Sequence, residues 1–161
     1  MPEEITMDNR NIVLMQQRHL DELAELEKAC FSHPWSRAGL EEEVDREGSL
    51  FLVAEAPDGR VMGYVGCQYV LDEGYITNVA VFPQDRRTGT AQALLSELEK
   101  KGRSLGLSFL SLEVRESNMP ARSLYEKLGY CQKGRRKNFY TDPREDGLIL
   151  TKTFERKEQT E

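Results

Sequence analysis

The sequence is poor in histidine and cysteine, and it contains no long apolar run. Among 161 residues there are two histidines and three cysteines. Cys30, Cys67 and Cys131 are far apart and do not form the close pairs that zinc and dithiol redox sites use. We expect reduced thiols, as in a cytosol, and interpret all three as packing residues. No stretch is long and apolar enough for a membrane span, and residues 1–4 (Met-Pro-Glu-Glu) lack the basic and then apolar order of a signal peptide. These absences predict a cytoplasmic protein that binds no membrane.

An excess of positive charge is also missing. The formal net charge is −6 at pH 7, which argues against a broad nucleic-acid-binding face, so we expect no direct contact with nucleic acid. A net negative charge is compatible with a local cluster of basic residues that binds an anion, and it favours a basic peptide as a substrate. The acids at residues 41–43 either attract such a peptide or form a solvated helix face. The basic run Arg135-Arg136-Lys137 is interpreted as a solvated strand face, with contact to a partner as the alternative.

Two familiar phosphate loops are absent, because neither Gly-x-x-x-x-Gly-Lys-Ser/Thr nor Gly-x-Gly-x-x-Gly occurs. In their place, the β-branched run at 78–81 leads into Arg86-Arg87-Thr88-Gly89-Thr90-Ala91, and apolar residues at helical spacing follow. Backbone N–H groups at a helix start lack intrahelical partners and attract anions. The glycine and alanine keep side chains away from an approaching phosphate, and the two arginines add positive charge. The stretch predicts a strand, a phosphate loop and a helix, with an ordinary glycine at a helix start as the alternative.

The remaining patterns predict one α/β domain over residues 1–161, with an ordered core at about 11–154 and a charged, frayed tail at 155–161. Apolar spacing predicts helices at 19–30, 36–47, 89–105 and 118–128. Apolar and β-branched runs predict strands at 12–15, 49–56, 61–71, 75–81, 107–114, 130–140 and 147–154. Pro57-Asp58-Gly59-Arg60 predicts a hairpin turn. A helix connects the strand at 75–81 to the strand at 107–114, so we expect these two to be parallel in a mixed sheet with helices on both faces.

Three residues have both a structural and a chemical interpretation. Glu113 stands near the end of an apolar strand, where half-burial could raise a carboxyl pKa toward the range of a general base. The alternative is a solvated acid at a strand end. Tyr125 lies in a helical pattern and either packs in the core or has a chemical role. Trp35, the only tryptophan, either anchors the loop 31–36 on the core or lines a substrate groove.

Several stretches share their residues and spacing with one known family. They are Phe31–Ser36, Leu71–Val81, the loop at 86–91, Leu112-Glu113-Val114-Arg115-Glu116-Ser117-Asn118, Ala121-Arg122-Ser123-Leu124-Tyr125-Glu126-Lys127-Leu128-Gly129-Tyr130, and Arg136–Tyr140 with Glu145-Asp146. On these stretches the chain resembles the bacterial ribosomal-protein-alanine N-acetyltransferase family, within the GNAT superfamily. The resemblance covers roughly residues 11 to 154.

The resemblance implies the GNAT fold, a mostly antiparallel sheet with a central splayed pair of parallel strands. It implies acetyl-CoA as the acetyl donor, Glu113 as general base and Tyr125 as general acid. The cofactor contacts that it implies are the backbone of Val79, Ala80 and Val81 for the acetyl-pantetheine arm, Asn118, and Arg87, Thr88, Gly89, Thr90, Ala91 and Gln92 for the pyrophosphate. Trp35 and Tyr140 would contact the substrate, and no metal is implied.

The implied reaction is direct transfer, in a ternary complex, to the N-terminal alanine of small-subunit ribosomal protein number eighteen. No Cys-His or Ser-His-Asp arrangement is present, which agrees with direct transfer. We interpret His19 and His33 as incidental surface or loop residues. Ala91 stands where glycine is commoner, and Phe139-Tyr140 replaces a pair of tyrosines, which leaves the fine substrate preference open.

Two other functions remain open at this point. One is a GNAT acetyltransferase acting on a lysine side chain or a small amine. The other is a non-catalytic acyl-CoA-binding module that serves as a partner scaffold.

Overall fold

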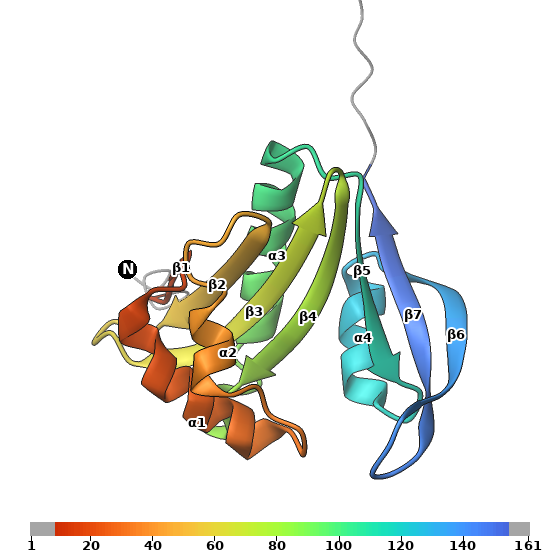
Figure 1. The fold of residues 1–161 in the computed structure, drawn as a ribbon, viewed down its shortest axis with the longest axis horizontal. Coiled ribbons are helices and arrows are strands. Elements are labelled where there is room, and N and C mark those ends of the chain that lie inside the picture. Colours follow the sequence, from red (N-terminus) through yellow and green to blue (C-terminus); the bar gives the residue numbers. More distant parts are fainter. Residues whose placement is uncertain (1–8, 155–161) are drawn as a thin grey trace, which may run out of the picture. The chain divides into compact units, whose positions relative to one another are not determined.

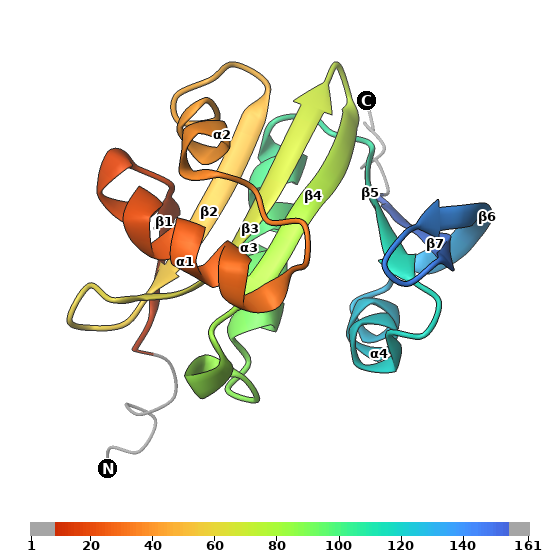
Figure 2. The same ribbon diagram turned by 60° about the horizontal axis from the view of Figure 1, so that its bottom comes forward.

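The computed structural model describes residues 9–154, and Figures 1 and 2 show its helices and strands. The strands are β1 (Asn11–Leu14), β2 (Ser49–Glu55), β3 (Val61–Val70), β4 (Glu73–Val81), β5 (Phe109–Arg115), β6 (Cys131–Tyr140) and β7 (Glu145–Thr153). The helices are α1 (Leu20–Cys30), α2 (Arg37–Glu41), α3 (Thr90–Ser104) and α4 (Met119–Lys127), with 3-10 turns at Gln17–His19 and Pro83–Asp85. Every predicted strand and helix is present. The tail predicted at 155–161 lies outside the described residues.

The strands form one sheet in the order β1-β2-β3-β4-β5-β7-β6. β4 and β5 are parallel, with Glu73 opposite Phe109 and Tyr75 opposite Ser111. This register covers the first three residues of each strand, which agrees with the predicted splay. β5 pairs antiparallel with β7, and β7 pairs antiparallel with β6. The predicted mixed, mostly antiparallel sheet is therefore confirmed.

The described chain divides into two compact units. The first unit contains the residues up to Cys67 together with Thr77–Leu98, and the second contains Gln68–Ile76 together with the residues from Glu99 onward. In the first unit, α1 and α2 lie on one face of β2, β3 and β4, and α3 lies on the other face (Figures 1 and 2). Within residues 9–154, no helix is long and apolar enough to cross a membrane.

The core of the first unit forms because α1 presents leucines on one side. Leu20, Leu23 and Leu26 are fully buried and pack in one cluster with Phe51 and Tyr64 from β2 and β3. Burying each such side chain contributes about 1.5–3 kcal/mol. The predicted hairpin at 57–60 is present and joins β2 to β3, which brings these two strands under the helix.

The second helix is shorter than the predicted span of 36–47. Ser36 caps it as expected, since its hydroxyl accepts a hydrogen bond from the Gly39 N–H at 3.0 Å. However, α2 ends at Glu41, and Asp45 has a φ of 59°. A right-handed helix cannot continue through that conformation.

The side chain of Glu43 gives a reason for this early end. Its carboxylate is buried and accepts hydrogen bonds from Ser49 Oγ and Arg46 Nη1. The chain after α2 therefore turns Glu43 inward, and the solvated helix face considered for residues 41–43 is wrong at this residue.

The second unit contains β5, β7 and β6 with α4 against one face of these strands (Figures 1 and 2). Asn118 caps α4 as predicted, because its Oδ1 accepts a hydrogen bond from the Ala121 N–H at 3.2 Å. Gly129, with a φ of 101°, follows the helix as a left-handed residue that ends it. The cap and the glycine fix where the chain leaves β5 and enters β6.

Two expectations about individual residues are wrong. Cys67 is buried and Cys30 is half-buried, but Cys131 is exposed and cannot be a packing residue. His19 is not incidental, since it is 1% exposed and its Nε2 lies 2.5 Å from Glu55 Oε2. Its Nδ1 accepts a hydrogen bond from the Gln16 N–H, so this ring joins the turn before α1 to the end of β2.

Candidate active site

The loop before α3 has the backbone of an anion-binding turn. Arg87 has a φ of 65° and Gly89 a φ of 83°, and α3 begins directly afterwards at Thr90. Left-handed residues of this kind turn successive N–H groups toward one concave side. A Cβ added at Gly89 would approach only Arg10 Nη1, at 3.8 Å, among the described atoms. Within the protein, glycine is therefore required here by the backbone conformation rather than by lack of space.

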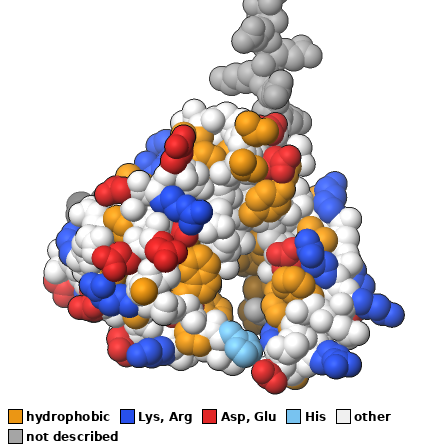
Figure 3. All heavy atoms as spheres, in the orientation of Figure 1, with side chains coloured by type: hydrophobic (Ala, Val, Ile, Leu, Met, Phe, Trp, Pro, Cys, Tyr) orange, Lys and Arg blue, Asp and Glu red, His pale blue; other side chains and the backbone are white. Residues whose placement is uncertain are grey.

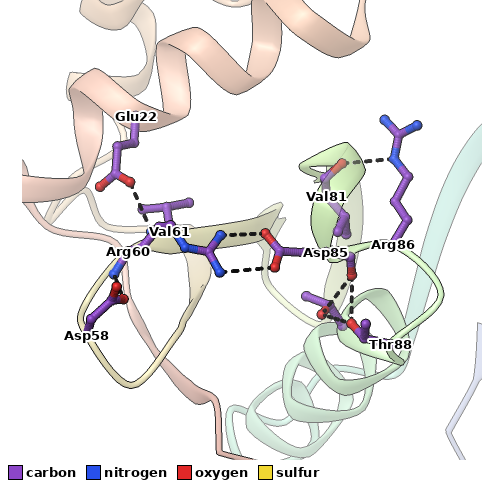
Figure 4. Close-up of polar contacts among 9 residues, drawn as sticks. Glu22, Asp58, Arg60, Val61, Val81, Asp85, Arg86 and Thr88 are labelled. Carbon is purple, nitrogen blue, oxygen red and sulfur yellow. Dashed lines mark hydrogen bonds and ion pairs between the residues drawn. The ribbon is translucent and has the colours of Figure 1, made fainter.

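The loop is held in place by its neighbours in the first unit (Figure 4). Thr88 Oγ1 donates to the backbone carbonyl of Asp85 at 2.6 Å. The Asp85 carboxylate is paired with Arg60 Nη1 at 2.7 Å, which ties the loop to the start of β3. Arg10 Nη2 donates to the Thr88 carbonyl at 2.6 Å. These contacts preorganise the turn and place the Arg10 guanidinium beside it.

Arg86 contacts the ends of β4 and α1. Its Nε donates to the Val81 carbonyl at 3.0 Å, and its Nη2 lies 3.4 Å from Cys30 Sγ (Figure 4). The guanidinium group of Arg86 therefore lies at the end of β4, where it contacts the last residue of β4 and the last residue of α1.

The two edges of β4 differ in their hydrogen bonding. The Phe82 N–H, directly after β4, donates to the Met62 carbonyl of β3 at 2.9 Å. Residues two apart on a strand direct their backbone groups to the same side. The N–H and C=O groups of Ala80 therefore point toward β3. Those of Val79 and Val81 point toward the other edge of β4.

The loop containing Trp35 is anchored by a buried carboxylate. Glu27 is 1% exposed, and its Oε1 accepts a hydrogen bond from the Trp35 backbone N–H at 2.8 Å. Its Oε2 accepts hydrogen bonds from Tyr64 Oη at 2.5 Å and from Asn78 Nδ2 at 3.2 Å. The Trp35 ring is 5.9 Å from that of Phe51, so Trp35 packs against the core of the first unit.

In the second unit, Glu113 lies half-buried on β5 and is paired with an arginine. Its side chain is 31% exposed, and Arg136 Nε on β6 lies 3.1 Å from its Oε2. On the intervening strand β7, Ile149 lies opposite Glu113 and Gly147 lies opposite Arg136. Residues opposite one another share a face of the sheet. Both long side chains therefore reach across β7 on one face, where the side chains of Phe139 and Tyr140 lie against Gly147.

Tyr125 on α4 is a buried phenol. It is 6% exposed, and its ring packs edge to face on Tyr130 with centroids 5.4 Å apart. Burial raises the pKa of Tyr125, because the phenolate would lose its hydration. The group therefore keeps its proton at neutral pH and can act as a proton donor.

Tyr140 lies close enough to Glu113 for the charge of that carboxylate to affect it. Burial, followed by the negative charge of Glu113, raises the pKa of Tyr140. The guanidinium of Arg115 stacks over its ring at 4.5 Å and donates to the carbonyls of Thr141 and Pro143. Arg115 thereby holds the β6–β7 turn, and Tyr140 with it, next to the end of β5.

The predicted site residues fall into two sets. The first unit contains Trp35 and the backbone groups from Val79 to Gln92, and the second contains Glu113, Asn118, Tyr125 and Tyr140. Among the described residues, no group of His, Cys, Asp and Glu side chains is suited to hold a metal ion.

Sequence reasoning missed Arg136 as a partner of Glu113 and missed Glu27 as the anchor of the Trp35 loop. Glu27 falls at helical spacing from Leu20 and Leu23, so its place on the buried face was a usable signal. The Arg136 pairing had no such signal, because it depends on strand order.

Residues 20–130 match the family model described as the Acetyltransferase (GNAT) family. The chain belongs to the GNAT acetyltransferase family. The ribosomal protein bS18-alanine N-acetyltransferase of Escherichia coli K12 is 35% identical over 128 residues, which are 78% of this chain and 84% of the relative. A crystal structure of the ribosomal-protein-S18-alanine N-acetyltransferase from Escherichia coli has a TM-score of 0.85 at 31% identity, covering 93% of this chain and 97% of that chain.

The GNAT fold is shared more widely. The PaiA N-acetyltransferase from Thermoplasma acidophilum, solved in complex with coenzyme A, has a TM-score of 0.75 at 20% identity and covers 91% of this chain and 100% of that chain. GNAT acetyltransferases use acetyl-CoA as the acetyl donor. The predicted family, fold and enzyme class are thus confirmed.

Proposed function

We propose that this GNAT enzyme is an N-alpha-acetyltransferase acting on the N-terminal alanine of ribosomal protein bS18. The observation that carries the proposal is the pair of groups in the second unit, a half-buried carboxylate at Glu113 and a buried, protonated phenol at Tyr125. Transfer to an amine needs a base for an ammonium and an acid for a thiolate, and these groups have those properties. Likeness to the bS18-alanine N-acetyltransferase of Escherichia coli over most of both chains supports this substrate.

The first unit suits acetyl-CoA, which supplies the acetyl group as a thioester when bound. The left-handed Arg87 and Gly89, the start of α3 and the nearby Arg10 guanidinium all favour an anion. We assign the pyrophosphate to Arg87, Thr88, Gly89, Thr90, Ala91 and Gln92. The acetyl-pantetheine arm is assigned to the backbone of Val79 and Val81, with Asn118 as a further contact, whereas Ala80, also expected there, directs its backbone groups to β3.

Glu113 is assigned the role of general base. The α-ammonium of a peptide has a pKa of about 8, so removing its proton at neutral pH costs only about 1 kcal/mol. A carboxylate acting directly or through one water is sufficient. The neutral amine then attacks the thioester carbonyl, and the Val81 N–H is assigned to stabilise the negative charge that develops on the oxygen.

Tyr125 is assigned the role of general acid. It donates its proton to the departing sulfur, and burial keeps the phenol protonated until that step. No nucleophilic side chain is required, which fits the engagement of His19 with Glu55. Trp35 and Tyr140 are assigned to hold the peptide end.

A competition assay tests the substrate. Acetyl-CoA is supplied with three acceptors together: an Ala-starting basic peptide with the bS18 N-terminal sequence, the same peptide with its α-amine blocked and one lysine free, and a polyamine. We expect the first to be acetylated preferentially, as measured by intact mass. Preference for the blocked peptide or the polyamine would replace the proposal with a lysine or small-amine acetyltransferase, and no transfer at all would favour a non-catalytic acyl-CoA-binding module.

A further inference from the structure

The loop before α3 is contacted by a residue from the start of the described chain. Arg10 lies directly before β1, and its Nη2 donates to the Thr88 carbonyl at 2.6 Å, although the two residues are 78 positions apart. The cofactor contacts that the family resemblance implies, from Arg87 to Gln92, do not include Arg10. The contact therefore connects a distant segment of the first unit to the loop assigned to the pyrophosphate.

The peptide group between Thr88 and Gly89 determines what this contact does. The peptide bond is trans, and in a trans peptide the C=O and N–H groups lie in one plane and point in opposite directions. Because Arg10 binds the Thr88 carbonyl, the Gly89 N–H points away from the guanidinium. An anion bound by that N–H lies on the side opposite Arg10, so Arg10 acts on it through the peptide group.

The backbone on either side of this peptide group is fixed by other hydrogen bonds. Thr88 Oγ1 donates to the Asp85 carbonyl at 2.6 Å (Figure 4), and the Gly89 carbonyl accepts the Ala93 N–H at 2.9 Å where α3 begins. Glycine adopts positive and negative φ about equally well, so the Thr88–Gly89 peptide could rotate and turn its N–H away from the binding side. The hydrogen bond from Arg10 favours the observed orientation, in which Gly89 has a φ of 83°.

We infer that Arg10 is a positioning residue for the cofactor, which holds the Thr88–Gly89 peptide so that the Gly89 N–H faces the pyrophosphate. This inference rests on the proposed function, which assigns the pyrophosphate to this loop. A charged donor on the carbonyl also polarises the peptide group and makes its N–H a stronger donor. Arg10 thereby reduces the ordering of the loop that cofactor binding would otherwise require.

Three variants of the full chain test the inference. Arg10→Met removes the charge and the donors but keeps a long side chain, whereas Arg10→Lys retains a cationic donor. Lys28→Met removes an equal charge from an exposed position on α1 and is the control. On the face of the first unit where α1 lies, acidic and basic side chains are interspersed (Figure 3), so this control measures the loss of one surface charge alone.

Three measurements are made on each variant. Calorimetry gives the affinity for CoA, and NMR follows the backbone amide resonance of Gly89 with and without CoA. Turnover of an Ala-starting peptide is measured with two acetyl donors, acetyl-CoA and acetyl-pantetheine, of which the second lacks the pyrophosphate.

We expect Arg10→Met to weaken CoA binding about fivefold, as for the loss of one hydrogen bond, and to shift the Gly89 amide resonance before CoA is added. The value of kcat/KM should fall by a similar factor with acetyl-CoA and stay unchanged with acetyl-pantetheine. Arg10→Lys should restore most of the affinity, and Lys28→Met should behave like the parent.

Several results would overturn the inference alone. A merely structural role of Arg10 would lower kcat/KM for both donors alike, and a direct contact with phosphate would leave the Gly89 amide of the CoA-free protein unchanged. Full CoA affinity in Arg10→Met, or an equal loss in Lys28→Met, would also contradict it. If CoA does not move the Gly89 amide resonance of the unmodified protein, the pyrophosphate is not bound at this loop, and the cofactor assignment in the proposed function fails as well.

Discussion

Two side chains of the second unit differ in ways that suit opposite proton-transfer roles. Glu113 is 31% exposed, so its carboxylate can exchange a proton with solvent between turnovers. Tyr125 is 6% exposed, so its phenol retains a proton that bulk water does not readily remove. The fold produces this difference by placing one residue at the end of a strand and the other on the packed face of a helix.

Replacing Glu113 by Gln should lower kcat/KM about 100-fold to 10,000-fold, because the general base is lost while the shape is kept. The loss should be greatest at low pH, where the amine most needs a base. Rates at several pH values with an Ala-starting peptide measure this effect. Glu116→Gln removes a partly exposed carboxylate three residues away, which is paired with Arg135, and serves as the control. A Glu113→Gln enzyme within a few-fold of its parent at every pH would exclude the assigned role.

Tyr125→Phe should slow the release of the thiolate and lower kcat by about 100-fold or more, with little effect on CoA affinity. The pKa of Tyr125 is raised, so the phenol stays protonated through neutral and mildly alkaline pH. The parent enzyme should consequently show no loss of kcat between about pH 7 and 9 through this group. Steady-state rates and CoA calorimetry measure the two effects, and an unchanged kcat in the variant would contradict the assignment.

At the scale of an element, the loop from Arg86 to Thr90 shows how sequence becomes a binding surface. Its N–H groups are oriented by two left-handed residues, and the Arg60–Asp85 pair and Thr88 hold that conformation before any ligand arrives. Such preorganisation lowers the entropy lost on binding. Gly89 is the residue where this conformation is most sensitive to substitution.

Gly89→Val should weaken CoA binding at least about tenfold, because a β-branched residue resists a φ of 83° and shifts the N–H groups. Calorimetric titration with CoA measures the change. The matched control is Gly59→Val, which places the same side chain at a φ of 91° in the β2–β3 turn, where an added Cβ meets no atom within 4 Å. Both variants should lose about 1–2 kcal/mol of stability, and only the first should lose CoA affinity. Equal affinity in both would refute the phosphate-loop assignment.

For the molecule as a whole, stability depends on a buried charged group that has no role in the proposed chemistry. Glu55 at the end of β2 is 7% exposed and contacts His19 and Arg18, each at 2.5 Å. Burial alone would raise the pKa of Glu55, but the hydrogen bonds from His19 and Arg18 outweigh it and lower that pKa. A carboxyl whose folded pKa lies below its unfolded value stabilises the fold above the unfolded value of about 4.3, and that stabilisation disappears as the pH falls through the folded value.

Glu55→Gln should therefore reduce the free energy of unfolding by about 1–3 kcal/mol at pH 7, and the difference from the parent should shrink below about pH 4. Urea unfolding at pH 7 and at lower pH measures both quantities. Glu47→Gln, at an exposed position, is the control and should change little at either pH. If the difference in free energy of unfolding between Glu55→Gln and the parent grows toward low pH, the folded pKa of Glu55 is not lowered.

Features that depend on a few neighbouring residues were predictable from the sequence. The turn at Pro57–Arg60, the caps at Ser36 and Asn118, and the change from strand to loop to helix around Gly89 follow from local backbone preferences and apolar spacing. The candidate base and acid were also visible, because the resemblance assigned roles to single positions. A single parallel pair followed from a helical connection between two strands.

Other features were decided only by tertiary structure. The sequence by itself set the periodicity that forms each strand, but the pairing of Glu113 with Arg136 requires β7 to lie between β5 and β6 with Gly147 opposite the arginine. The burial of His19 against Glu55 and the inward turn of Glu43 likewise depend on groups outside their own elements. Charged and polar side chains are mostly exposed unless a partner compensates their desolvation, and that partner is supplied by the packing of distant segments.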